Sequence, residues 1–138
     1  MWIGYALLSA VFAAAVGILG KIGLKDVDST LATTIRSVVM AVFLLGAATM
    51  LQKFSLIKTV SSNTLTFIVF SGIAGALSWL FYFLALKHGP ASGVAALDRL
   101  SVVFVVILAA LFLGEALTLK SGMGLVFLVI GALLILFK

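Results

Sequence analysis

The chain of 138 residues has no cysteine, a single histidine, a single proline and few charged side chains. Without cysteine there are no disulfides and no thiolate metal sites, and one histidine cannot build a metal site by itself. We therefore expect neither a metal nor a cofactor. Charged residues make up 9% of the chain and hydrophobic residues 64%, whereas soluble domains carry about 25% charged residues. This composition indicates an integral membrane protein that contacts the lipid bilayer.

The net charge of +5 could suggest nucleic acid as a partner, but the nine basic residues are scattered between apolar blocks and form no continuous patch. We therefore expect no nucleic-acid binding and interpret the basic residues as anchors at the membrane interface. The N-terminal stretch MWIGYALLSAVFAAAVGILG lacks a basic segment before its apolar run, which favours a retained span over a cleaved signal peptide. Trp2 and Tyr5 fit an interfacial aromatic belt.

Five apolar stretches are long enough to cross a bilayer, which takes about 20 residues of helix. They predict an all-α integral membrane fold, a bundle of five transmembrane helices forming a single membrane domain over 1–138, with spans at about 2–22, 30–51, 64–86, 90–114 and 118–137. Asp28 or Ser29 is expected to cap the second helix and Asn63 the third, while Pro90 suits the first turn of the fourth.

The lysines give little direction for orientation in the membrane. Three are expected on the side that holds the N-terminus and four on the other: Lys53, Lys58 and Lys120 against Lys21, Lys25, Lys87 and Lys138. Two interpretations stay open. Either the orientation is fixed by a subtler feature, or the topology is dual and copies insert both ways, which would permit an antiparallel homodimer.

Three ionisable residues lie inside the expected spans, namely Arg36, Asp98 and Arg99. Each costs about 2.5 to 3.5 kcal/mol at a helix centre on insertion scales, so they should face protein or water and should pair. At 1.5 Å per residue, Arg36 and Asp98 lie roughly 10 to 12 Å in from the same face. The third span brings Ser78, Trp79 and Tyr82 to a similar depth. We therefore expect a polar layer inside the membrane.

We predict that Asp98 pairs with Arg36 or with Arg99 beside a water-accessible cavity that Trp79 and Tyr82 line. The alternative is a dry ion pair that only fixes helix packing. Two arginines and nearby Lys21 face one carboxylate, and the surplus positive charge suits an anionic or zwitterionic solute. The predicted solute-binding or pathway residues are Lys21, Arg36, Ser78, Trp79, Tyr82, Asp98 and Arg99. Gly124 and Gly131 are predicted to serve helix packing or a dimer contact.

The segment from Ala85 to Leu136, which contains Leu113, Gly114 and Glu115 (LGE) before a glycine-bearing last helix, resembles the second half of an EamA domain of the drug/metabolite transporter superfamily. The upstream stretches KIGLKDVDSTLATTIRSVV and SGIAGALSWLFYFLALKHGPAS are similar to its single-domain, five-helix bacterial and archaeal branch. That branch carries an acid-base pair before LS in the fourth helix. The resemblance covers nearly the whole chain.

This resemblance implies a multi-pass transporter of small metabolites, a secondary carrier or facilitator in the cell (inner) membrane of a prokaryote. It also implies half of a ten-helix inverted repeat, completed by an antiparallel second copy. Two departures stand out. Two-domain members often have prolines in the fourth helix where this chain has Ala96 and Val102, so no proline predicts a kink there. The first span lacks the acid that small four-helix multidrug exporters use.

For Asp98 we favour a structural and electrostatic role over that of a proton carrier, and for Glu115 a role at a helix end over solute contact. A non-transporting membrane scaffold or regulatory subunit is the alternative function. An enzyme is not expected, because the sequence offers no plausible nucleophile and base pair.

Overall fold

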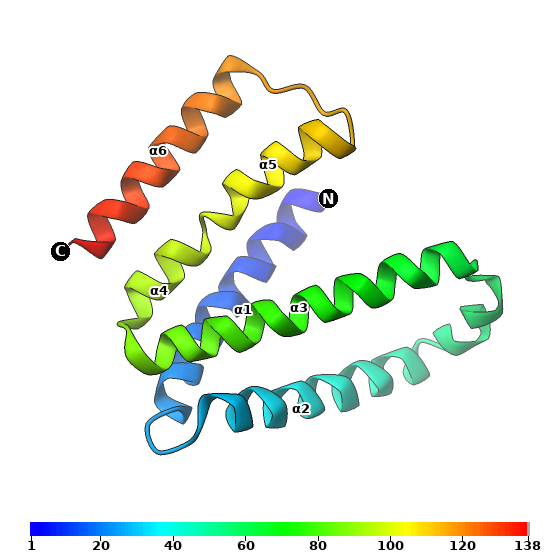
Figure 1. Cartoon of the computed structure of the whole chain (residues 1–138). Helices are drawn as coiled ribbons and strands as arrows, with labels where there is room; N and C mark the ends of the chain where they lie inside the picture. The colour runs from blue at the N-terminus through cyan, green and yellow to red at the C-terminus, as the bar shows by residue number, and fades with distance from the viewer. Residues whose placement is uncertain (138) are drawn as a thin grey trace. The chain divides into compact units, whose positions relative to one another are not determined.

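The computed structural model describes residues 1–137, so Lys138, which the orientation argument counted, lies outside the described residues. The described chain is helical, and Figure 1 shows the helices in chain order. The elements are α1 (Trp2–Gly23), α2 (Ser29–Met50), the 3₁₀ helix η1 (Lys53–Thr59), α3 (Ser62–His88), α4 (Ala91–Asp98), α5 (Ser101–Phe112) and α6 (Leu119–Leu136). Within residues 1–137, five helical segments are long and apolar enough to cross a membrane, with α4 and α5 together forming one of them. The all-α prediction with five spans is confirmed.

The chain divides into two compact units, and each is described by itself. One unit contains residues 1–21 and the chain from His88 onward, and therefore holds most of α1 together with α4, α5 and α6. The other runs from Ile22 to Lys87 and holds α2, η1 and α3. The chain passes from one unit to the other at Lys21–Ile22 and at Lys87–His88.

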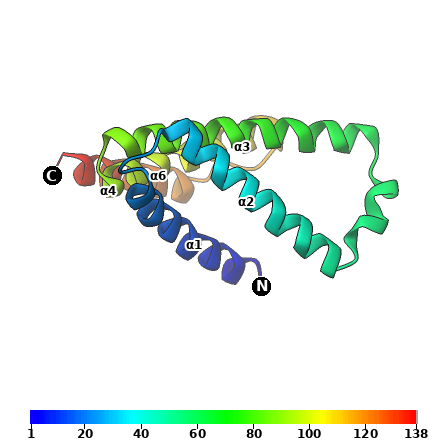
Figure 2. The ribbon, with the colours of Figure 1, turned by 90° about the horizontal axis from the view of Figure 1, so that it is seen from below.

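Figure 2 shows the helices α2 and α3, which belong to one unit together with η1. Both long helices start at a side-chain cap. The carboxylate of Asp28 accepts hydrogen bonds from the backbone N–H groups of Thr30 (2.9 Å) and Leu31 (3.0 Å), so Asp28 is the N-cap of α2. The hydroxyl of Ser61 accepts from the N–H of Thr64 at 3.2 Å at the start of α3. The prediction that Asn63 caps this helix is wrong, because Asn63 lies within its first turn.

The connection between α1 and α2 is tied to the C-terminal end of α3 in the same unit. The ammonium nitrogen of Lys87 donates hydrogen bonds to the carbonyl oxygens of Leu24 and Val27, both at 2.8 Å. Among residues 1–137, the large side chains that are fully buried are those of Leu24 in this connection and Leu86 in the last turn of α3. A charged side chain thus satisfies loop carbonyls that have no helical partner.

The fourth span is not one helix. It is interrupted between Asp98, the last residue of α4, and Ser101, the first of α5. The N–H groups of Leu100, Val102 and Val103 donate to carbonyl oxygens three residues back, at 2.9, 3.1 and 2.9 Å. Arg99 and Leu100 both have ψ of −15°, a value typical of a 3₁₀ turn and not of an α-helix. The span predicted over 90–114 is therefore present, but a tightened turn that no proline marks interrupts its helix. The helix also begins after Pro90, which is its N-cap.

In the unit that holds α4, this helix packs against α6 through small residues. A Cβ added to Gly93 would lie 3.7 Å from the Cδ1 of Leu136 and 3.3 Å from the Cγ of Pro90, so α6 approaches α4 closely at this point. Ala96 on α4 and Ala132 on α6 are buried. Small residues permit the close approach that drives helix association in lipid.

The LGE sequence ends α5. Gly114 has φ of +68°, and the N–H of Glu115 turns back to the carbonyl oxygen of Ala109 at 3.3 Å. A left-handed glycine just beyond a helix is a common helix stop. The following helix, α6, begins at a capping box in which Thr118 and Ser121 exchange side-chain and backbone hydrogen bonds.

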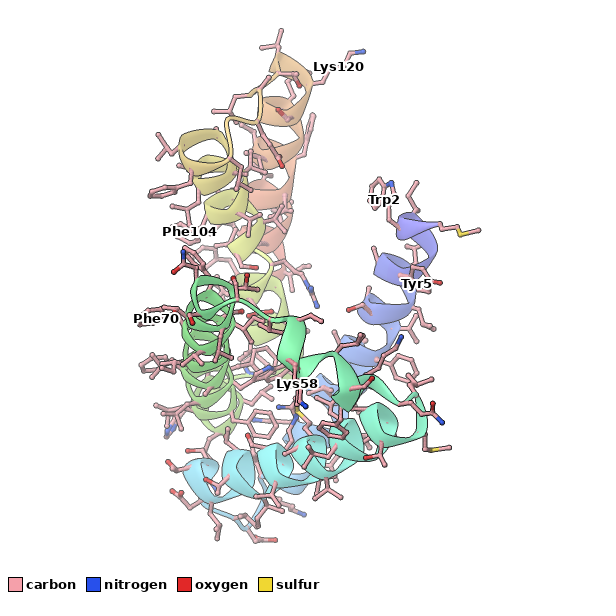
Figure 3. The ribbon with its side chains drawn as sticks, turned by 90° about the vertical axis from the view of Figure 1, so that its right-hand side faces the viewer. Trp2, Tyr5, Lys58, Phe70, Phe104 and Lys120 are labelled. Carbon is pink, nitrogen blue, oxygen red and sulfur yellow. The ribbon has the colours of Figure 1, made fainter. Side chains whose placement is uncertain are left out.

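Large apolar side chains cover the outside of the spans. Phe70 on α3 and Phe104 on α5, labelled in Figure 3, are each 65% exposed in the isolated chain. Trp2 and Tyr5 are exposed on the first turns of α1, and Lys120 lies in the first turn of α6. Apolar area on this scale has to be covered by lipid or by another protein.

Candidate functional site

Helices α2 and α3 bring the side chains of Arg36 and Trp79 into contact. The central guanidinium carbon of Arg36 lies over the Trp79 ring, 3.8 Å from the ring centroid. This is well inside the distance of about 6 Å at which a cation interacts with an aromatic face. The sequence had placed both residues in one layer of the membrane, and the structure joins them as a stacked pair.

Two further aromatic rings surround this pair. Tyr82 meets Trp79 edge to face with ring centroids 5.4 Å apart, and Phe83 does so at 6.2 Å. The guanidinium carbon of Arg36 is 5.6 Å from the Phe83 ring, and Phe83 is only 4% exposed. Phe83 is absent from the predicted set of site residues. The sequence could have identified Phe83 by its spacing, because a residue four positions after Trp79 lies on the same face of a helix.

One nitrogen of Arg36 lacks a hydrogen-bond partner within the described chain. Nη1 is buried, and no atom of residues 1–137 accepts a hydrogen bond from it. Leaving a buried donor unpaired costs about 1 to 3 kcal/mol, and more when the group is charged. A charged N–H group in this state is therefore poised to bind an acceptor that the described chain does not supply.

The hydroxyl groups that flank Arg36 on α2 are already engaged. Thr33 donates to the carbonyl oxygen of Ser29 at 2.7 Å, and Ser37 donates to that of Thr33 at 2.8 Å. Hydroxyls in membrane helices commonly satisfy themselves on their own backbone in this way. Since the hydroxyl groups of Thr33 and Ser37 already donate to the backbone, the guanidinium of Arg36 is the side-chain donor between them that can reach another acceptor. Ser78, adjacent to Trp79 on α3, is exposed.

The other predicted site residues belong to the second unit. Lys21 donates to the carbonyl oxygen of Gly89 at 2.8 Å, which ties the end of α1 to the turn before α4. Asp98 and Arg99 are exposed and lie where α4 gives way to α5. The pairing of Asp98 with Arg36 or Arg99, and the cavity beside it, stay predictions.

Gly124 and Gly131 lie seven residues apart on α6 and have open space beside them. A Cβ added to either glycine would meet no atom within 4 Å outside its own chain neighbourhood. Their predicted role at a subunit contact stays a prediction. In the described part of the chain, no group of three or more His, Cys, Asp or Glu side chains could hold a metal ion.

Comparison with known proteins gives a family for this arrangement. Residues 1–137 match the EamA-like transporter family. The chain belongs to this family. It is also 41% identical over 134 residues to an "uncharacterized transporter in cobO 3'region" from Sinorhizobium sp.. The aligned residues cover 97% of this chain and 95% of the relative. No solved structure matches. This EamA protein is therefore a multi-pass membrane transporter, and its five-span domain is half of a repeat.

Proposed function

We propose that this EamA protein carries small anionic or zwitterionic metabolites across the cell membrane of a prokaryote and works as an antiparallel homodimer. The observation that carries the charge preference is the buried Nη1 of Arg36 beside Trp79, which has no acceptor among residues 1–137. An uncompensated guanidinium favours a solute that brings a negative group.

The odd number of spans supports the antiparallel arrangement. Five helices place the two ends of a domain on opposite membrane faces, and inverted repeats in larger transporters use two such domains in opposite orientation. A single five-span chain offers one half of that pattern, and a second copy inserted the other way supplies the rest. The near-equal numbers of lysines on the two faces agree with insertion in both orientations.

In this proposal Arg36, Trp79 and Tyr82 form the centre of the solute site in each copy, with Ser78 beside them. Lys21, Asp98 and Arg99 belong to the pathway, where the carboxylate of Asp98 balances part of the positive charge. Gly124 and Gly131 lie at the subunit contact, because small residues with open space beside them allow a neighbouring helix to approach closely.

Transport is tested without guessing the solute. Proteoliposomes are incubated in a ¹³C-labelled small-molecule extract of cells, and the labelled compounds that enter are identified by mass spectrometry. We expect acidic or zwitterionic compounds to enter with the native protein and not with Arg36→Gln. Lys53→Gln, in the exposed 3₁₀ helix η1, is the matched control for loss of one positive charge. If no compound enters, the alternative of a scaffold or regulatory subunit is favoured.

Topology needs a separate measurement. Two C-terminal reporter fusions, one active only in the cytoplasm and one only outside it, should both give strong signals if copies insert in both orientations. A strong signal from one fusion alone would contradict the antiparallel homodimer while leaving the solute preference standing.

A further inference from the structure

We infer that Trp79 is a positioning residue, which holds the Arg36 guanidinium flat so that its edge receives the carboxylate group of the solute. This inference rests on the proposed function and makes it more specific in two respects. It assigns the negative group of the solute to a carboxylate, and it assigns Trp79 to Arg36 and not to the carbon skeleton of the solute.

The first step is geometric. The indole ring occupies one side of the guanidinium at 3.8 Å, a distance that leaves no space for a ligand between them. Guanidinium N–H bonds lie in the plane of the group and point outward as a rigid fork. A ligand therefore has to meet Arg36 at the edge of the guanidinium, where Nη1 has no acceptor among residues 1–137.

The second step concerns the chemistry of the acceptor. A planar carboxylate offers two oxygens in the spacing of two parallel N–H groups, which gives a bidentate and charge-assisted pair. Of the acids in the same unit, Asp28 is engaged at the N-cap of α2, and Asp26 is exposed in the connection between α1 and α2. Residues 22–87, the unit that holds Arg36, thus provide no carboxylate of their own for this edge.

The third step concerns Trp79. Its ring is already in contact with Arg36 on its face and with Tyr82 and Phe83 through edge-to-face packing. Stacking restricts the many rotamers of an arginine side chain, so Arg36 loses less conformational entropy when a ligand binds its guanidinium. Removing the ring should weaken carboxylate binding about two- to tenfold, since ordering one long side chain at a binding site costs about that factor in affinity.

Carboxylate binding is tested with butyrate, which absorbs no light near 280 nm. The chain has two tryptophans, so Trp2→Phe leaves Trp79 as the single tryptophan, which is excited at a wavelength that tyrosine does not absorb. We expect butyrate to change Trp79 emission with saturation and the neutral analogue butyramide to have no effect. Arg36→Gln should abolish the response, and Arg36→Lys, which keeps the charge without the fork, should weaken binding at least tenfold.

Three results would overturn the carboxylate assignment. An equal response to butyramide would show that no charge is recognised. A response to inorganic phosphate alone would show a tetrahedral anion site. Binding of butyrate only after Asp98→Asn would show that Asp98 already occupies the guanidinium edge. Circular dichroism checks that each variant keeps its helices, and Arg36→Lys serves where Arg36→Gln fails to fold.

The positioning role is tested by varying ligand length. The dissociation constants of acetate, butyrate and hexanoate are measured by calorimetry for the native protein, Trp79→Leu and Trp79→Phe. We expect Trp79→Leu to weaken the binding of all three acids by the same factor. Trp79→Phe, which keeps an aromatic face, should bind them nearly as tightly as the native protein. A loss that grows from acetate to hexanoate would show that Trp79 contacts the carbon chain, which overturns the positioning role.

These measurements are made in detergent and do not depend on flux. Saturable butyrate binding without any solute entering proteoliposomes would overturn the transport proposal and leave the carboxylate site intact. Solute entry that requires Arg36, together with no butyrate response, would overturn the carboxylate site alone.

Discussion

The ammonium nitrogen of Lys87 lies 2.8 Å from the carbonyl oxygen of Leu24, and one side chain at the end of α3 thereby fixes the connection that leads into α2. The same nitrogen also reaches the carbonyl oxygen of Val27 at 2.8 Å. These contacts join the start of α2 to the end of α3. Arg36 and Trp79 meet about two turns away from them, counted along each helix.

Replacing Lys87 with methionine keeps the unbranched side chain out to Cε, lacks the ammonium group and removes both hydrogen bonds. We expect Lys87→Met to lower the free energy of unfolding by about 1 to 3 kcal/mol, because a hydrogen bond from a charged donor is worth about that amount when partly buried. Reversible unfolding in mixed micelles measures the change. Lys25→Met, an exposed position in the same connection, is the control and should be close to neutral.

Gly114 should resist substitution because of its left-handed backbone. With φ of +68°, an alanine at this position is strained by about 1 to 2 kcal/mol, and Gly114→Ala should destabilise the protein accordingly. Gly46→Ala, inside α2 with open space around it, should instead be neutral or stabilising by up to about 1 kcal/mol. Equal effects at the two sites would show that the end of α5 does not depend on this turn.

Bulk on one face of α6 should separate the subunits. Gly124→Leu and Gly131→Leu each add a side chain where the single chain has open space, so we expect the helices to form and the fraction of dimer to fall. Photobleaching steps of labelled protein in vesicles count the copies. Gly122→Leu, on a different face of the same helix, should leave the dimer intact. An unchanged dimer in the first two variants would remove α6 from the contact.

Backbone exchange should identify the break between α4 and α5. The three-residue hydrogen bonds of Leu100, Val102 and Val103 are poorer in geometry than α-helical bonds. We expect these amides to exchange hydrogen for deuterium at least tenfold faster than those of Leu108–Phe112 in the continuous part of α5. Equal protection across the whole span would show an uninterrupted helix in solution.

The sequence predicts the spans well because membrane crossing depends on local composition. A run of about 20 apolar residues identifies a helix wherever it lies, and Asp28 marks its start by a short side chain that reaches the backbone two and three residues on. The helix η1 and the break after Asp98 carry no such mark. The break arises at Arg99 and Leu100 from right-handed backbone angles that many residues adopt. The helix η1 follows Gln52, whose φ of 53° is uncommon outside glycine and is marked by no sequence pattern.

The candidate site is predictable in part for a similar reason. Helical periodicity and depth suffice to place Arg36 and Trp79 in one layer, since both count residues from a helix end. Phe83 was missed because a buried phenylalanine is indistinguishable from ordinary core packing in a chain this apolar. The partner of Asp98 depends on packing between distant segments, which spacing along the sequence does not encode.

The interruption after Asp98 also changes the directions in which the side chains of α5 point relative to those of α4. A 3₁₀ turn winds about 120° per residue where an α-helix winds about 100°, so two residues of tighter winding advance the following helix by roughly 40°. On a regular α-helix Ala91, Ala95, Asp98 and Val102 would share one face, but with this turn between them they form no straight stripe. Every side chain of α5 is rotated by that angle relative to Asp98, and any choice of inward-facing residues beyond Leu100 has to include this phase shift.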